Sequence, residues 1–137
     1  MKIVVDTNVF ISGAFFSGPP YHILKLWQER KLQFLITSEI FDEYKRVSEI
    51  LTNQFSEIDL NQILNYLLMN SEMIVPTIIN ETICDDPDDD KFLACAITGN
   101  CKIIVSGDKH LLKVSGYKNI EVLKPREFLN RFNSIIE

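Results

Sequence analysis

Acidic residues follow two apolar runs that have the composition of buried strands. Asp6 directly follows the run at residues 3–5, and Asp108 follows the run at residues 103–105 after a two-residue step. A single aspartate after a strand is usually the N-cap of a helix. In open α/β sheets, however, ligands bind beyond the carboxyl ends of the strands. Two aspartates at the ends of neighbouring parallel strands lie close together, which capping does not require, so both are candidate site residues.

A further group of acids is concentrated in residues 85–90, where five of the six residues are aspartate. Asp86 as N-cap and Pro87 at the first helical position predict the start of a helix. One or two acids suffice to complement the helix dipole, and additional aspartates repel one another. The surplus of acids indicates a ligand, and a solvated acidic helix start is the competing interpretation.

Within this run, Asp89 is the candidate site residue. It precedes Phe92 and Leu93 by three and four residues, so it shares their inward face of the predicted helix. Asp88 and Asp90 are predicted to point outward.

Glu43 is the fourth candidate acid, on a helix predicted from Ser38 to Leu51. The inward stripe of that helix is formed by Ile40, Tyr44, Val47 and Leu51. Glu43 lies about 70° from the centre of this stripe, nearer to the sheet than the other acids of the helix. Taken alone, this helix favours a boundary glutamate that extends into solvent.

Four carboxylates at one edge of a sheet would repel one another and weaken the fold: Asp6, Glu43, Asp89 and Asp108. A hard divalent cation such as Mg²⁺ or Mn²⁺ resolves this conflict, because it prefers oxygen ligands. Such an ion activates water and neutralises charge on a phosphodiester during hydrolysis. One or two ions are compatible with this set of acids.

Histidines and cysteines offer no competing ligand cluster. His22 and His110 are isolated, and His110 is expected to be a solvated loop residue or a substrate contact. Cys84, Cys95 and Cys101 lack CxxC spacing and are expected to be reduced thiols.

Strand and helix patterns alternate along the chain and position these acids. Apolar runs rich in Val and Ile predict strands at 3–5, 32–36, 103–105 and 120–123, with a further short strand at 73–75. Helices are predicted at 20–29, 38–51, 59–69, 87–97 and 125–132. This alternation predicts an α/β fold in three layers, with a central parallel sheet covered by helices on both faces. The length of 137 residues corresponds to one domain, residues 1–137.

The formal net charge of −5 is unevenly distributed. Residues 47–101 contain ten acids and one base, whereas both ends of the chain are mildly basic. The acidic balance argues against a protein that coats nucleic acid by overall positive charge, but not against local contacts. Arg46 and Lys109 lie near the candidate acids and are candidate phosphate contacts. The apolar run at the start of the chain is too short for a signal peptide, and an acid follows it too early. No apolar run approaches the length of a membrane span. A cytoplasmic protein without membrane contact is therefore expected.

Several short motifs in a fixed order resemble one known family. They are VVDTNVF at 4–10, Ser38 with Glu43, DPDDDKFLACA at 86–96, SGDKHLL at 106–112 and PREFL at 125–129. This ordered set resembles the PIN domain, within the wider group of metal-dependent 5′-nuclease-like folds. It looks closest to the branch of toxin components of toxin–antitoxin pairs, related to VapC-like toxins.

The resemblance implies roles for individual residues. The four family acids correspond to Asp6, Glu43, Asp89 and Asp108, as metal ligands and catalytic residues. Asp89 is chosen over Asp90 because it lies seven residues before Ala96 and faces inward. Asn8 resembles the asparagine that orients the first acid by hydrogen bonding, and Ser106 matches a small hydroxyl residue near the last acid.

The resemblance also implies a sheet order of 3-2-1-4-5, Mg²⁺ or Mn²⁺, and endoribonuclease activity on RNA. It implies frequent homodimers and, for toxins, a small antitoxin protein that blocks the site. The leading hypothesis is therefore metal-dependent hydrolysis of RNA phosphodiester bonds, in which a metal-bound water attacks phosphorus in line.

Three alternatives start from other interpretations of the same residues. A PIN-like scaffold that only binds RNA or protein would not need four intact acids. A receiver-type signalling domain would match Lys124-Pro125 but requires an acid pair after the first strand. A haloacid-type phosphatase requires Asp-x-Asp there, and position 8 is Asn.

Overall fold

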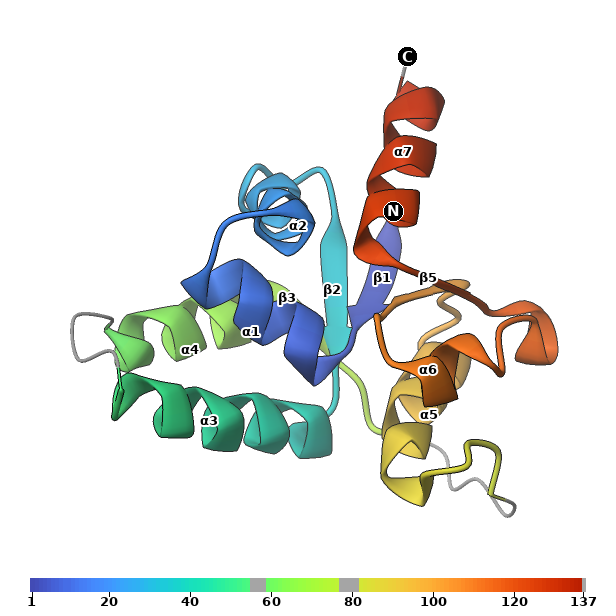
Figure 1. Cartoon of the computed structure of the whole chain (residues 1–137), viewed down its shortest axis with the longest axis horizontal. Coiled ribbons are helices and arrows are strands. Elements are labelled where there is room, and N and C mark those ends of the chain that lie inside the picture. The colour runs from blue at the N-terminus through green and yellow to red at the C-terminus, as the bar shows by residue number, and fades with distance from the viewer. Residues whose placement is uncertain (55–58, 77–81, 137) are drawn as a thin grey trace.

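The computed structural model describes residues 1–54, 59–76 and 82–136, and its centre is one parallel sheet (Figure 1). The five strands are β1 (Lys2–Val5), β2 (Gln33–Ile36), β3 (Ser71–Met73), β4 (Ile103–Val105) and β5 (Glu121–Leu123). Their order is β3-β2-β1-β4-β5, with every neighbouring pair parallel. This is the order implied by the resemblance. Receiver domains have the order 2-1-3-4-5, so the receiver alternative is wrong.

Helices connect the strands and confirm the predicted alternation. They are α1 (Thr7–Phe15), α2 (Pro19–Gln28), α3 (Ser38–Thr52), α4 (Leu60–Met69), α5 (Asp90–Thr98), α6 (Lys109–Leu112) and α7 (Pro125–Ile136). Short 3₁₀ turns, η1 and η2, lie at Pro87–Asp89 and Tyr117–Asn119. The helix predicted at 87–97 is therefore divided into η1 and α5. The helices α1 and α6 were not predicted.

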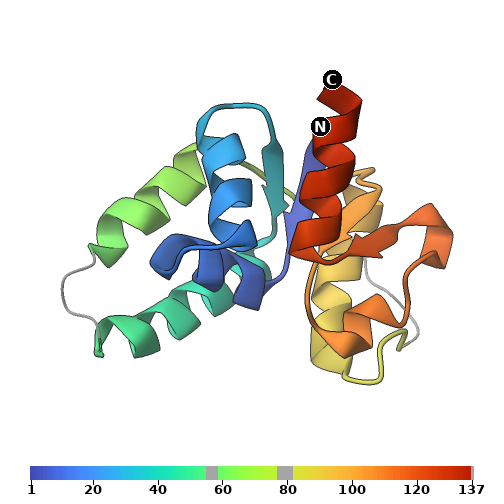
Figure 2. The same ribbon diagram turned by 45° about the horizontal axis from the view of Figure 1, so that its top comes forward.

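The helices cover both faces of the sheet, as the predicted three-layer architecture requires. The helices α1 and α2 lie together on one side of β1 and β2, and α5 lies on the other side (Figures 1 and 2). The helix α5 packs against β1, β2 and β4, and α7 packs beside α2. No helix among the described residues is long and apolar enough to span a membrane.

The strands are buried because their side chains are apolar and both faces are covered. In β1 and β2 only the first residue is exposed, and the other three are buried. Stacked rings extend the core outward: the centroids of Trp27 and Phe34 are 4.5 Å apart, and those of Phe10 and Tyr44 are 4.4 Å apart. The three cysteines are free and buried, as expected for reduced thiols.

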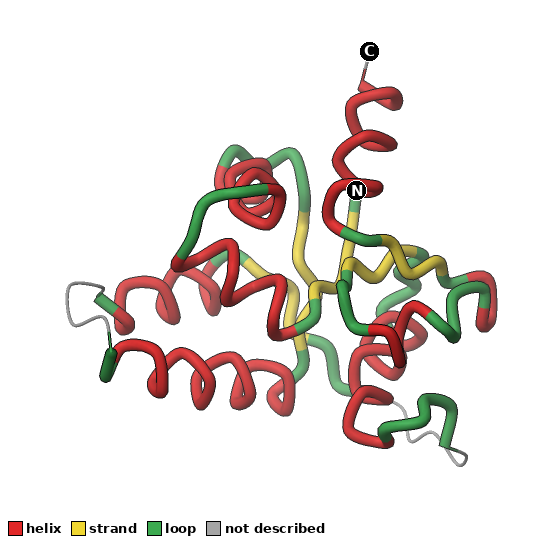
Figure 3. The backbone as a smooth tube through the Cα atoms, in the orientation of Figure 1, coloured by secondary structure: helices red, strands yellow, loops and turns green. Residues whose placement is uncertain are grey.

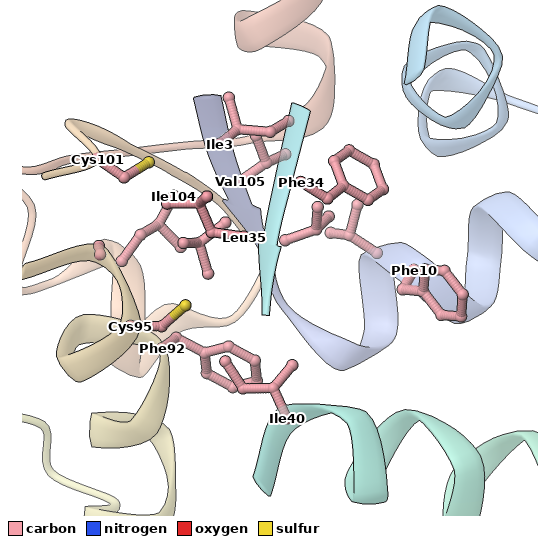
Figure 4. Packing of buried hydrophobic residues seen from close by; sticks show 14 of the residues in the cluster. Ile3, Phe10, Phe34, Leu35, Ile40, Phe92, Cys95, Cys101, Ile104 and Val105 are labelled. Atoms are coloured by element: carbon pink, nitrogen blue, oxygen red, sulfur yellow. The ribbon is translucent and has the colours of Figure 1, made fainter. Parts of the chain in front are cut away.

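Two packing contacts bring α3 to the carboxyl end of the sheet. The Tyr44 hydroxyl donates a hydrogen bond to the carbonyl of Val5, the last residue of β1. Ile40 of α3 and Phe92 of α5 point toward one another beyond the end of β2 (Figure 4). Because α3 is held to the end of β1, Glu43 lies close to Asp6, the residue that follows β1.

Two connections at this edge are very short (Figure 3). Only Asp6 separates β1 from α1, and only Thr37 separates β2 from α3. Both residues cap the helix that follows, because their side-chain oxygens accept hydrogen bonds from Val9 and Ile40 amides. Short connections leave little freedom in the position of Asp6 relative to the sheet.

Candidate active site

Asp6 lies at the centre of the site and is held from two sides. Its side chain is buried, with an exposed fraction of 4% for the residue. Its carboxylate accepts a hydrogen bond from the Val9 amide at 2.8 Å and another from the Ser106 hydroxyl. Asp6 therefore does cap α1, but capping uses only its Oδ1, and Oδ2 accepts the hydrogen bond from Ser106.

Ser106 links the first and the last candidate acids. Its buried hydroxyl donates to Asp6 and accepts a hydrogen bond from the Asp108 amide at 2.9 Å. Asp108 in turn caps α6, because its carboxylate accepts the His110 amide at 2.7 Å. Asp6 and Asp108 thus follow the neighbouring strands β1 and β4 and share one bridging hydroxyl, as two acids on one functional edge require.

Ser106→Ala is expected to lower the free energy of unfolding by about 2 kcal/mol, because it leaves the part-buried Asp108 amide without its acceptor and removes the buried hydrogen bond to Asp6. The same change removes a hydrogen bond that lowers the pKa of Asp6, so that pKa should rise further. Urea unfolding measures the first effect. Ser17→Ala, at an exposed position between α1 and α2, is the matched control. Equal stability of the two variants would contradict the bridging role.

Glu43 makes contacts that reach beyond its own helix. Its carboxylate accepts a hydrogen bond from the Thr7 hydroxyl and forms an ion pair with Lys91. The Arg46 guanidinium lies 3.9 Å from the same carboxylate. Glu43 is half-buried and directed toward the sheet edge, so it does not extend into solvent as its helix alone suggested.

Lys91 is a buried base among acids. Its side chain is 5% exposed, and its Nζ contacts Glu43, the Asp88 carboxylate at 3.0 Å and the Asp88 carbonyl at 2.9 Å. Burial alone lowers the pKa of Lys91, but the hydrogen bonds and charges of Glu43 and Asp88 outweigh it and raise that pKa above its ordinary value. The ammonium therefore stays charged in the folded chain.

The aspartate run divides into residues with different roles. Asp86 caps η1 as predicted, because its carboxylate accepts the Asp88 amide. Asp88 is exposed, as expected, although its carboxylate pairs with Lys91. The prediction that Asp90 points outward is wrong: its carboxylate accepts hydrogen bonds from the Ile83 and Cys84 amides at 3.1 and 2.8 Å. Asp90 anchors the segment before the run and is not free to bind a ligand.

A hollow of about 180 Å³ brings the candidate acids together. Its lining consists of Asp6, Thr7, Asn8, Glu43, Arg46, Val47, Asp88, Asp89, Phe92 and Asp108. Ser106 lies beneath it, bridging two of the acids. Lys109 is exposed and is not part of the lining. The structure therefore gathers all four acids, with Arg46 and Asn8 beside them.

Asn8 lines this hollow but does not donate a hydrogen bond to Asp6 in the described part of the chain. Among the described residues, the donors to the Asp6 carboxylate are the Val9 amide and the Ser106 hydroxyl. Asn8 is exposed. The orienting hydrogen bond that the resemblance assigns to Asn8 is supplied here by Ser106.

Burial and like charges perturb two of the acids. The pKa of Asp6 is raised to about 6, first by burial and further by the charges of Asp108 and Glu43, against the hydrogen bonds from Ser106 and Val9. The pKa of Asp89 is also raised to about 6, by burial and then by the charges of Asp108 and Asp86. One buried oxygen of Asp89, Oδ2, has no hydrogen-bond partner. The site therefore holds negative charge that no protein group fully compensates.

These properties fit a hard divalent cation. Among the described residues, no group of three Asp, Glu, His or Cys side chains lies close enough together to hold a metal ion without rearrangement. The donor set is nevertheless made of carboxylate oxygens, the kind that Mg²⁺ and Mn²⁺ prefer, and the unpartnered oxygen of Asp89 lies in it. A cation would relieve the repulsion that raises the two pKa values.

Two residues of the site, Thr7 and Lys91, were missed in the sequence. Lys91 carried one signal, because it is the only base among residues 47–101. A lysine directly after three aspartates is most simply interpreted as a solvated countercharge to them. The burial of Lys91 depends on the approach of α3 to α5, which the local sequence does not indicate. Thr7 gave no signal beyond its position next to Asp6.

Comparison with known proteins identifies a family and a relative for this chain. A family model described as PIN domain matches residues 2–110. An uncharacterized protein of Methanocaldococcus jannaschii is 33% identical over an alignment of 150 positions, which covers 99% of this chain and 94% of that protein.

Two solved structures share the fold at low sequence identity. One is VapBC2 from Rickettsia felis bound to a DNA fragment from their promoter, with 15% identity, a TM-score of 0.59, and coverage of 90% of this chain and 98% of that chain. The other is PAE2754 from Pyrobaculum aerophilum, with 14% identity, a TM-score of 0.62, and coverage of 98% and 90%. With a family match over most of its length and the sheet order described above, this chain belongs to the PIN domain family.

Proposed function

We propose that this chain is a metal-dependent endoribonuclease, formed by a single PIN-like domain of residues 1–137 that acts in the cytoplasm. The observation that carries this proposal is that one hollow is lined by four acids: Asp6, Glu43, Asp89 and Asp108. In the described site these acids repel one another, and Oδ2 of Asp89 has no hydrogen-bond partner. PIN domains are generally nucleases that use divalent metal ions. A scaffold that only binds RNA or protein has no use for such repulsion, which weakens the fold.

The acids at the edge of the sheet are the residues that would hold Mg²⁺ or Mn²⁺. When bound, the cation supplies activation of a water molecule and neutralisation of charge on the phosphodiester. The remaining steps fall to the chain itself. Ser106 and the Val9 amide fix the Asp6 carboxylate, so that this acid needs no reorientation during the reaction.

Positive charge beside the acids would bind the RNA backbone. Arg46 lines the hollow and is largely exposed, which places a guanidinium where a phosphate can approach. Lys109 follows Asp108 at the start of α6 and is exposed. We assign both to phosphate contacts and Asn8, at the rim of the hollow, to contact with the substrate.

We further propose that the chain is the toxin of a toxin–antitoxin pair. The support is the similarity of its fold to VapBC2 from Rickettsia felis. On this proposal a small antitoxin protein covers the acidic hollow and blocks access of RNA, and the chain forms a homodimer. Purification of the chain without any bound partner is therefore necessary before activity is measured.

Cleavage of a mixed RNA substrate by the purified chain tests the proposal. We expect cleavage that requires Mg²⁺ or Mn²⁺ and is lost in Asp6→Asn, because the substitution removes a negative charge from the centre of the site. Asp59→Asn is the matched control, since Asp59 caps α4 outside the hollow and asparagine caps equally well.

Two outcomes would contradict the enzyme. A wild-type chain that stays inactive with both metals would favour the PIN-like scaffold that binds RNA or protein without cutting it. Equal cleavage by wild type and Asp6→Asn would assign the activity to another site.

A further inference from the structure

The ammonium of Lys91 is fully committed inside the site. A lysine ammonium has three N–H donors, and Nζ of Lys91 has three acceptors: the Glu43 carboxylate, the Asp88 carboxylate and the Asp88 carbonyl. Its side chain is buried, and Nζ lies over the ring of Phe92, 5.4 Å from the centroid. Lysines are almost never buried to this extent unless they are paired. The position is thus built for a charged group.

Both oxygens of Glu43 are also engaged. Oε1 accepts the hydrogen bond from the Thr7 hydroxyl, and Oε2 pairs with Lys91. Arg46 adds a second positive charge 3.9 Å from Oε2. A metal ion could bind Glu43 only if one of these contacts were broken.

The other three acids of the site are in the opposite situation. Within the described ranges, Asp6, Asp89 and Asp108 form no ion pair with a base. The charges of Asp108 and Glu43 act on Asp6, and those of Asp108 and Asp86 act on Asp89, where His110 and Lys91 oppose them from a distance. Oδ2 of Asp89 is buried without a hydrogen-bond partner. The four acids therefore divide into one that is paired with a base and three that are not.

We propose that Lys91 is the resident cation of Glu43, and that the divalent ion binds to Asp6, Asp89 and Asp108 without direct ligation by Glu43. This inference rests on the metal-dependent site proposed above and changes the role of one of its acids. Lys91 acts as a positioning residue: it fixes the Glu43 carboxylate and occupies the place beside it that a second metal ion would need. One divalent ion per chain follows.

Calorimetric titration of the metal-free chain with Mn²⁺ tests this division. The decisive variant is Lys91→Met combined with Glu43→Gln, which removes the ion pair without changing the net charge. We expect this double variant to bind one Mn²⁺ with an affinity within about fivefold of wild type, whereas loss of a direct ligand in Asp89→Asn weakens binding at least about tenfold. A loss beyond about fivefold in the double variant would show that metal binding depends on Glu43, either as a ligand or through a neighbouring acid, and would overturn the proposal.

The single variants provide a second readout that a purely structural lysine would not give. Lys91→Met removes a positive charge and frees a carboxylate, so Mn²⁺ should bind at least about fivefold more tightly or with a second ion per chain. The gain should disappear when Glu43→Gln is added, and Lys91→Arg should behave as wild type. Unchanged or weaker Mn²⁺ binding by a folded Lys91→Met would overturn the proposal. If circular dichroism shows that Lys91→Met does not fold, the double variant still decides, because replacing both partners of a buried pair is often tolerated.

The readout separates this inference from the proposed function. A chain that binds Mn²⁺ as expected but cuts no RNA contradicts only the ribonuclease. A chain that cuts RNA but loses Mn²⁺ in the double variant contradicts only the role of Lys91. A wild-type chain that binds no Mn²⁺ contradicts both.

Discussion

Asp89→Asn is expected to abolish RNA cleavage and, at the same time, to stabilise the metal-free protein. The substitution removes an acid of the proposed metal site, which should reduce cleavage by at least about 100-fold. It also removes a negative charge that Asp108 and Asp86 repel. Burial and this repulsion raise the pKa of the Asp89 carboxyl group to about 6. Because Asp89 is partly exposed, we expect a gain of only about 1 kcal/mol in the free energy of unfolding at pH 7.5. A gain in stability together with a loss of activity is typical of residues kept for function.

The neighbouring Asp90→Asn is a matched comparison with the opposite expected result. Asp90 receives hydrogen bonds from the Ile83 and Cys84 amides, and charge-assisted bonds of this kind are the stronger ones. We expect a loss of about 2 kcal/mol in stability, because one amide loses its charged acceptor. At temperatures where the variant is folded, cleavage should persist.

Thermal unfolding without metal and RNA cleavage with Mn²⁺, measured on both variants, complete this test. The stability gain of Asp89→Asn should raise the unfolding temperature by about 3 °C. If Asp90→Asn lost cleavage while keeping its stability, Asp90 would be the third acid of the site. A destabilised Asp89→Asn would show that the repulsion around this residue is already compensated.

The sequence was sufficient for features that depend on local composition. The strands β1, β2, β4 and β5 were predicted to within one residue at each end, because buried parallel strands are continuous apolar runs. Asp6 and Asp108 could be placed at one sheet edge for the same reason, since each follows such a run. The order of the strands came from the resemblance to a family, because hydrophobic patterns do not specify which strands are neighbours.

Features that depend on the environment of a residue could not be obtained in this way. The helix α1 has apolar residues on several sides, with Val9, Phe10 and Ile11 consecutive and buried, so no helical period is visible. The edge strand β3 has the sequence Ser-Glu-Met and was predicted two residues too late, because an edge strand needs no apolar run.

The same limit applies within the site. Asp90 has its role only because the chain before the aspartate run returns to it, and Lys91 has its role only because α3 approaches α5. Both are contacts between segments that no spacing rule connects. The sequence identified which residue types could perform the chemistry, and the fold determined which of them are free to do so.

The stability of the metal-free protein should depend on pH through Asp6, and Mn²⁺ should remove this dependence. The pKa of Asp6 is about 6 in the folded chain, against an ordinary value of 3.8, so the folded state binds a proton more strongly than the unfolded state does. By linkage, the Asp6 contribution falls as pH rises from about 4 to about 6 and is constant above that range. The total effect is about 3 kcal/mol, since Asp6 is 4% exposed and little screened by solvent.

A comparison with Asp6→Asn isolates this contribution from those of other carboxylates, many of which act in the opposite direction. Asparagine cannot ionise, so the variant should gain stability relative to wild type as pH rises from 4 to 6.5, measured by urea unfolding without metal. At pH 7.5, Mn²⁺ at about 100 times its dissociation constant should stabilise wild type by about 2.7 kcal/mol, and Asp6→Asn by much less. At pH 4.5, where Asp6 is protonated in the folded chain, Mn²⁺ should have little effect on either protein. A stability difference between the two proteins that does not change with pH would contradict the raised pKa of Asp6, and with it the argument that this buried carboxylate is kept ionised for a cation.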